Sequence, residues 1–98
     1  MTSLSAPSQR RDVWLEFAGE VDLTAGWAEV ALDEHWAATI DTSSYLVFLT
    51  SYDAGSVFVQ NRTPRSFEIH ATSVPGRRGH ATVHCAYRVM GRPKAPPA

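Results

Sequence analysis

Hydrophobic and polar residues alternate along most of this chain with a period of two, which is typical of β-strands. Residues 12–18 show the alternation first, and the pattern predicts a strand that ends or bends at Gly19. Residues 26–32 repeat it and predict a second strand close behind the first. Residues 45–50 are almost continuously apolar, which is typical of a buried central strand.

Turn-forming residues separate three further predicted strands. Asp, Gly, Asn and Pro bracket residues 56–61 and 66–71, and residues 80–90 predict a long last strand with one apolar face. Only residues 33–40 have helical character, because Asp33 can cap a helix whose face carries Leu32, Trp36 and Ile40. We expect one or two helical turns there. Together these elements predict an all-β fold: a compact antiparallel sandwich or barrel, or a trimer-forming sheet, of six to seven short strands with at most one short helical turn.

Length and composition indicate a single domain. The 98 residues are 44% hydrophobic and 19% charged, which suits one hydrophobic core. We expect residues 1–11 to form a flexible N-terminal arm, residues 12–91 a single β domain, and residues 92–98 a Pro-rich C-terminal tail in which the sheet does not continue. No apolar run matches a membrane span and the N-terminus has no signal-peptide pattern, so we expect neither membrane insertion nor export by the usual route.

Charge divides the chain into an acidic and a basic half. Nine of the ten acids lie between Asp12 and Asp53, where there is no Lys or Arg, and seven of the nine bases follow residue 54. Such asymmetry can mark a nucleic-acid-binding face, or acidic and basic surfaces that pair within a chain or between subunits. The chain lacks the clustered basic and aromatic motifs of nucleic-acid modules, which favours pairing, and we expect no nucleic-acid partner.

No pattern of residues indicates catalysis. The chain has neither a nucleophile elbow nor a Gly-rich phosphate loop, so we expect no enzyme and no cofactor. His70, His80 and His84 can be imagined around a metal ion, but strand spacing does not match the helical zinc motif, and we predict no metal site. Histidines at a subunit interface would instead make assembly sensitive to mildly acidic pH. Cys85, the only cysteine, falls on the apolar face of the last strand, where burial should raise the pKa of its thiol.

A few aromatic and basic residues are candidates for contact with a partner or ligand. Aromatic rings can stack on sugars or anchor an interface, or they can simply fill the core of a small domain. Arginines at a loop tip can contact phosphate or carboxylate groups, or remain solvated. The candidates are Trp14, Trp27, Trp36, Tyr52, Arg77 and Arg78.

Much of the chain resembles a recurring frame. The frame opens F-x-G-x-a-x-L-x-x-G-x-A-x-V-x-L-D-x-x-F-A-x-x-V, continues through Y-x-V-F-L-T and L-Y-V-x-N, and closes F-x-Y-R-I-V-A-x-R. The matching segments are 17–23, 26–33, 36–40, 42–50, 57–63, 66–69 and 86–92. With this order and spacing, residues 15–92 resemble a small β-rich module at the C-terminal ends of bacteriophage tail-fibre-like proteins and of uncharacterised bacterial surface proteins.

The resemblance implies a structural and adhesive role without enzyme activity, as a homotrimer in a bacteriophage virion assembled in the host cytoplasm. Because no long fibre shaft precedes the module in this sequence, we expect equally a tail-fibre-like protein or a small decoration protein. Residues 74–79 differ from the Gly-rich turn of the frame, so any ligand of this loop would be its own. The expected partners are further copies of the chain, other virion proteins through the N-terminal arm, and a host-surface glycan. The alternative is a stand-alone carbohydrate- or receptor-binding β module of a bacterium.

Overall fold

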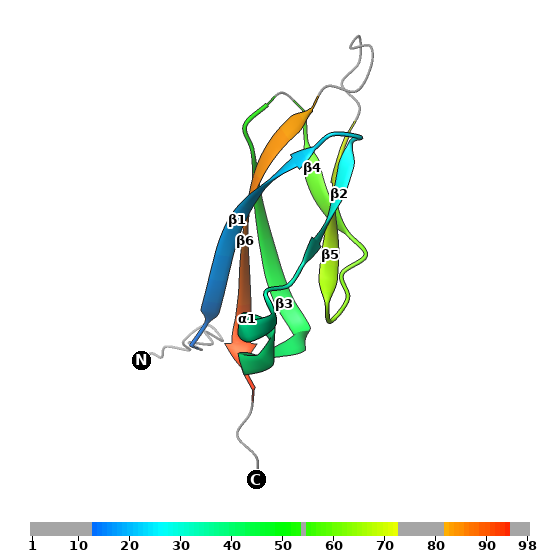
Figure 1. Ribbon diagram of the computed structural model, residues 1–98. Coiled ribbons are helices and arrows are strands. Elements are labelled where there is room, and N and C mark those ends of the chain that lie inside the picture. The colour runs from blue at the N-terminus through cyan, green and yellow to red at the C-terminus, as the bar shows by residue number, and fades with distance from the viewer. Residues whose placement is uncertain (1–12, 54, 73–81, 95–98) are drawn as a thin grey trace, which may run out of the picture.

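The protein is built from two three-stranded antiparallel sheets (Figure 1). The computed structural model describes residues 13–53, 55–72 and 82–94. One sheet has the strand order β1-β6-β3 and the other β2-β5-β4. The elements are β1 (Leu15–Leu23), β2 (Trp27–Ala31), α1 (Glu34–Thr39), β3 (Ile40–Ser51), β4 (Val57–Gln60), β5 (Ser66–Ala71) and β6 (Val83–Pro93). The prediction of an all-β antiparallel fold with one short helix is therefore confirmed for the described residues.

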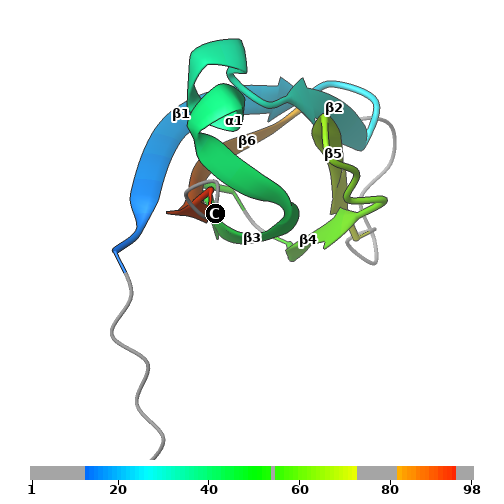
Figure 2. The ribbon, with the colours of Figure 1, turned by 90° about the horizontal axis from the view of Figure 1, so that it is seen from below.

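The two sheets face each other across one core. Seen along the strands, β1 lies beside β2 and β3 beside β4, so that all the strands surround a common interior (Figure 2). No ladder of backbone hydrogen bonds joins the two sheets at these seams in the described part of the chain. Gly26 lies in the turn between β1 and β2 with φ +85°, a left-handed conformation that glycine adopts without strain. The arrangement is a sandwich whose seams are open.

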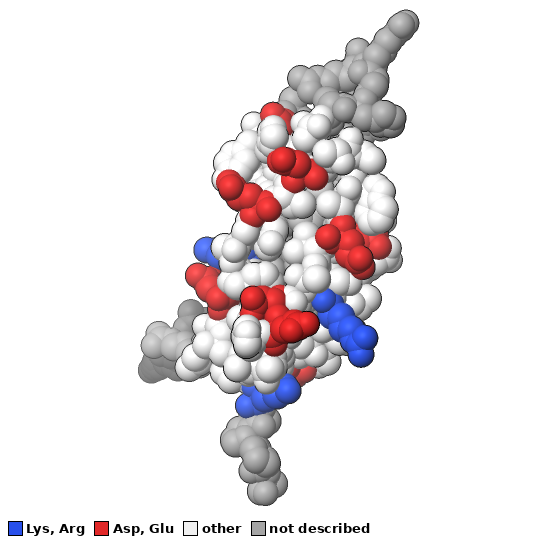
Figure 3. All heavy atoms as spheres, in the orientation of Figure 1, with Lys and Arg blue, Asp and Glu red and all other residues white. Residues whose placement is uncertain are grey.

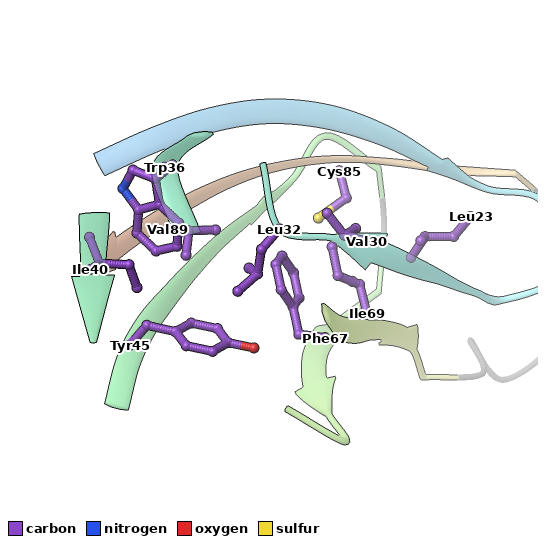
Figure 4. Packing of buried hydrophobic residues seen from close by; sticks show 10 residues of the cluster. All are labelled: Leu23, Val30, Leu32, Trp36, Ile40, Tyr45, Phe67, Ile69, Cys85 and Val89. Atoms are coloured by element: carbon purple, nitrogen blue, oxygen red, sulfur yellow. The ribbon is translucent and has the colours of Figure 1, made fainter. Parts of the chain in front are cut away.

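Alternating side chains of both sheets fill this interior. The central strands contribute Phe67 and Ile69 from β5 and Cys85 and Val89 from β6, all essentially inaccessible to solvent (Figure 4). The positions between them point outward, because successive side chains of a strand lie on opposite faces. No buried side chain among the described residues is charged or polar in type, so burial of apolar surface is the main stabilising term.

The short helix α1 closes one end of the core. Asp33 is its N-cap, and its carboxylate accepts a hydrogen bond from the backbone N–H of Trp36 at 2.8 Å. Leu32, Trp36 and Ile40 are all buried, which confirms the predicted apolar face. Residues 41–44 are part of β3, where the pairing with β6 shifts register between Ile40 and Tyr45.

Two strands run further than the sequence predicted, since the first was expected to end or bend at Gly19 and the sheet was expected not to continue into residues 92–98. Strand β1 runs through Gly19 to Leu23, because Gly19 lies opposite Tyr87 and its missing Cβ leaves room for the tyrosine ring. Strand β6 likewise continues past Gly91 to Pro93, so residues 92 and 93 belong to the sheet rather than to a tail. A Cβ at Gly91 would lie 2.9 Å from the Ile40 side chain, so glycine allows the close packing there.

Several sequence predictions fall on segments outside the described residues. These segments contain the expected arm, the loop with Arg77 and Arg78, and His80. Within the described residues, no helix has the length and apolar character that a membrane span requires.

Candidate functional site

The outer face of sheet β2-β5-β4 combines aromatic and acidic side chains. Two rows of residues cross the three strands in register, one aromatic and one polar. We call this surface the aromatic–acidic face and define it by Trp27, Glu29, Phe58, Gln60, Glu68 and His70. Strand alternation places these side chains outward because their neighbours Val30, Phe67 and Ile69 are buried.

The aromatic row is a stack of three rings. The His70 ring lies between Trp27 and Phe58, with centroid distances of 5.7 Å to each and interplanar angles of 15° and 23°. The stack fixes the rings, yet Trp27 remains 48% and Phe58 40% exposed. A large aromatic side chain that stays exposed but ordered is suited to contact with a partner or ligand.

The polar row carries two carboxylates side by side. Glu29 lies directly opposite Glu68, an arrangement of like charges that is unfavourable for the sheet itself. The Glu68 carboxylate lies 2.8 Å from His70 Nε2 and accepts a hydrogen bond from Asn61 Nδ2 at 3.0 Å. The hydrogen bond with His70, and to a smaller extent the one from Asn61, lowers the pKa of Glu68 below its ordinary value. The carboxylate is therefore ionised at neutral pH and held in a fixed orientation.

Hydrogen bonds occupy only part of this acidic pair. Glu29 Oε2 accepts from the Ser66 hydroxyl at 3.1 Å, and Glu68 uses Oε1 for both of its contacts. The second oxygen of each carboxylate has no hydrogen-bond partner within the described ranges. Two oriented acceptors thus lie beside exposed ring surfaces, and hydroxyl donors of a ligand can reach them.

The charge asymmetry of the sequence is also an asymmetry in space. Acidic side chains gather on the face of the molecule seen in Figure 3, with few basic ones among them. Outward positions of β1 carry Glu16, Glu20 and Asp22. Arg88 Nε approaches Glu16 Oε2 at 3.9 Å with both side chains half exposed, which is a weak surface ion pair.

The predicted contact residues do not form one site. Trp36 is a core residue, only 9% exposed, because α1 turns it inward against Phe17 and Tyr45; of the two alternatives for this ring, the structure shows the core-filling one. Trp14 lies under the guanidinium of Arg92, 5.1 Å from ring centroid to Cζ.

Tyr52 is 61% exposed and lies near the start of β6, where its backbone N–H donates to the carbonyl oxygen of His84. Trp14 lies near the other end of β6, because the next residue, Leu15, pairs with Gly91. Trp27 belongs to the other sheet. Arg77 and Arg78 are outside the described residues.

Sequence reasoning missed Phe58, Glu68 and His70 as members of a site. Their signal was an aromatic or titratable residue at the polar positions of two predicted strands. The strand register that brings them beside Trp27 is a tertiary feature.

The described histidines do not converge on a metal. His70 contacts Glu68 on one sheet, and His84 Nδ1 contacts Asp22 on the other. No group of three metal-ligating side chains occurs among the residues that the structure describes, and His80 lies outside them. Cys85 is 1% exposed, and burial raises the pKa of its thiol, as the sequence predicted.

Fold and site together define a small two-sheet all-β domain with an exposed aromatic–acidic face. A scan against protein-family models and a search of curated proteins both give no match to this chain.

Proposed function

We propose that this protein is a non-enzymatic structural and adhesive protein of a bacteriophage particle, and that its aromatic–acidic face contacts a host-surface glycan. The observation that carries the proposal is the exposed ring stack of Trp27, His70 and Phe58 beside two oriented carboxylates. Aromatic surface suits the apolar faces of pyranose rings, and carboxylates accept hydrogen bonds from sugar hydroxyls. The resemblance of residues 15–92 to tail-fibre-like modules supports a place on the particle.

Assembly as a homotrimer is part of the proposal. The outer face of sheet β1-β6-β3 exposes Leu46 and Phe48 to 42% and 44%, and Arg88 lies over the Phe48 ring at 5.0 Å. A domain of this size buries a modest share of its surface, so covering these side chains with another copy would add stability. The N-terminal arm would dock to other virion proteins, and Tyr52 would be a further contact.

The adhesive role is tested by binding of the purified protein to an array of neutral and carboxylated oligosaccharides. We expect Trp27→Ala to lose the binding that the parent protein shows, because the substitution removes the most exposed ring of the stack. The control is Val13→Ala, which removes an exposed apolar side chain that belongs neither to the aromatic–acidic face nor to the proposed trimer contact. Absence of binding by the parent protein, or equal binding by Trp27→Ala, would overturn the adhesive role.

The same face supports a second candidate, a stand-alone carbohydrate- or receptor-binding module of a bacterium. Light scattering at neutral pH separates the two. A mass of three chains favours the virion protein, and a monomer that binds oligosaccharides favours the bacterial module.

A further inference from the structure

A groove runs along the open seam between β3 and β4. The two strands lie side by side but belong to different sheets, so no backbone ladder closes the seam. The groove has a volume of about 330 Å³ and is lined by Val47, Val59, Gln60, Asn61 and Arg62. The groove is shallow and largely open to solvent, so a ligand in it stays partly exposed.

Arg62 is held at one end of the groove, where a smaller hollow with Ser43 and Tyr45 adjoins it. Its Nη1 donates a hydrogen bond to the Tyr45 carbonyl oxygen, and its Cζ lies 5.7 Å from the centre of the Tyr45 ring. Tyr45 is itself fixed, since its hydroxyl lies 2.8 Å from the Thr63 carbonyl oxygen. A guanidinium has five N–H donors, so a positioned Arg62 retains donors that a ligand can use.

The groove adjoins the aromatic–acidic face. Gln60 lines the groove and also lies opposite Glu68 in the β4–β5 register. Asn61, with a left-handed φ of 51°, ends β4, and its amide donates to the Glu68 carboxylate. Gln60 and Asn61 therefore lie between Phe58 and Arg62 in the chain, and both are neighbours of Glu68.

The lining of the groove resembles a sugar site in its chemistry. Its exposed surface is mainly polar, because Val47 and Val59 pack against the core and expose little apolar area there. The amides of Gln60 and Asn61 offer both donors and acceptors. Arg62 adds a planar donor pair, which matches the two oxygens of a carboxylate. The nearby charges of Glu29 and Glu68 repel an anion, so a carboxylate is favoured only at the Arg62 end.

We propose that this groove is a subsite for a carboxylated pyranose, either a uronic acid or a sialic acid, within a longer glycan. Its carboxylate binds Arg62, its ring hydroxyls bind the amides of Gln60 and Asn61, and the next sugar extends toward the aromatic–acidic face. The subsite rests on the proposed adhesive function, because the rest of the glycan occupies that face.

The test compares matched probes by calorimetry and by amide chemical shifts. The probes are lactose, 3′-sialyllactose and a hyaluronan tetrasaccharide, which separate the neutral, sialic-acid and uronic-acid cases. We expect the parent protein to bind one carboxylated probe more tightly than lactose, and Arg62→Ala to weaken that binding roughly tenfold without changing lactose binding. Arg62→Lys should recover part of the loss, since it keeps the charge but not the planar fork. Arg65→Ala is the control, because Arg65 is on the same turn but lines neither hollow.

The outcomes separate the subsite from the function on which it rests. Binding of lactose with no preference for a carboxylated probe, or a preference that survives Arg62→Ala, would overturn the subsite and leave the adhesive face standing. No binding of any probe by the parent protein, together with a silent oligosaccharide array, would overturn both. Equal binding of a short aspartate-rich peptide at Arg62 would show that the groove recognises peptide carboxylates, which also overturns the sugar subsite.

Discussion

Replacement of Gly19 by alanine is the sharpest test of how the core is packed. A Cβ at this position would lie 2.4 Å from Tyr87 Oη and 2.6 Å from Cζ, well inside van der Waals contact. The ring therefore has to move. It packs edge-on against Phe17 and Phe67, at centroid distances of 6.2 and 5.8 Å, and cannot shift without loosening both contacts.

These contacts set the size of the expected effect. Each aromatic pair contributes about 0.5–1.5 kcal/mol beyond its buried area, so loosening two pairs costs about 2 kcal/mol. Removing a glycine from a strand returns about 0.5–1 kcal/mol by reducing the entropy of the unfolded chain. We expect Gly19→Ala to lower the free energy of unfolding by a net of about 1–2 kcal/mol. This loss of stability can be measured by urea denaturation, followed by tryptophan fluorescence. We expect a lower unfolding midpoint and an unchanged dependence of the unfolding free energy on urea concentration.

A second background isolates the steric cause. In Tyr87→Leu the ring is absent, and the additional Gly19→Ala substitution should be neutral or stabilising. The double-mutant cycle should therefore give a coupling energy of about 1 kcal/mol or more between the two positions. An equal cost of Gly19→Ala in both backgrounds, or no cost in either, would refute the reasoning.

Two further predictions concern a helix cap and a surface histidine. Asp33→Ala should destabilise the protein by about 1 kcal/mol, because the N–H of Trp36 loses its acceptor, whereas Asp33→Asn should retain most of the stability; equal unfolding midpoints for Asp33→Ala and the parent protein would contradict the capping role. The hydrogen bond and charge of Asp22 raise the pKa of His84 above 6.5, so the stabilising pair is complete below that pH and is lost as the pH rises through the raised pKa. Asp22→Asn should return the His84 pKa toward 6.5 in an NMR titration and flatten the loss of stability with rising pH, and an unchanged His84 titration would show that Asp22 is not the cause.

The alternation of side chains predicted most of the fold because it is a local property. Phe67 and Ile69 alternate with Glu68 and His70, and the structure buries the first pair and leaves the second at the outer face. The helix could also be predicted from the sequence, because Asp is a favoured N-cap residue and Asp33 directly precedes the helical pattern. The role of Gly19 was not visible, because it depends on a tyrosine from β6 that lies opposite only once the sheet has formed.

The tryptophans show the same difference between what a local pattern predicts and what depends on tertiary packing. Trp36 shares a helical face with Leu32 and Ile40, and the structure buries all three. Trp27 lies at a polar position of its strand, next to the outward Glu29, which favoured the surface. What the sequence did not reveal is that His70 and Phe58 complete a stack with Trp27, because the three come from strands whose register is set by tertiary packing.

The distribution of charge constrains how the protein can approach a negatively charged surface. The face in Figure 3 is mainly acidic, and the outward carboxylates of β1 add to it. Such a face repels anionic glycans and phosphates over distances of about 8–10 Å at physiological ionic strength. The turn between β4 and β5 differs, since Arg62 and Arg65 follow directly on β4. If the protein binds a glycan as proposed, we therefore expect a carboxylate to be repelled from most of the aromatic–acidic face and to approach at its β4 edge.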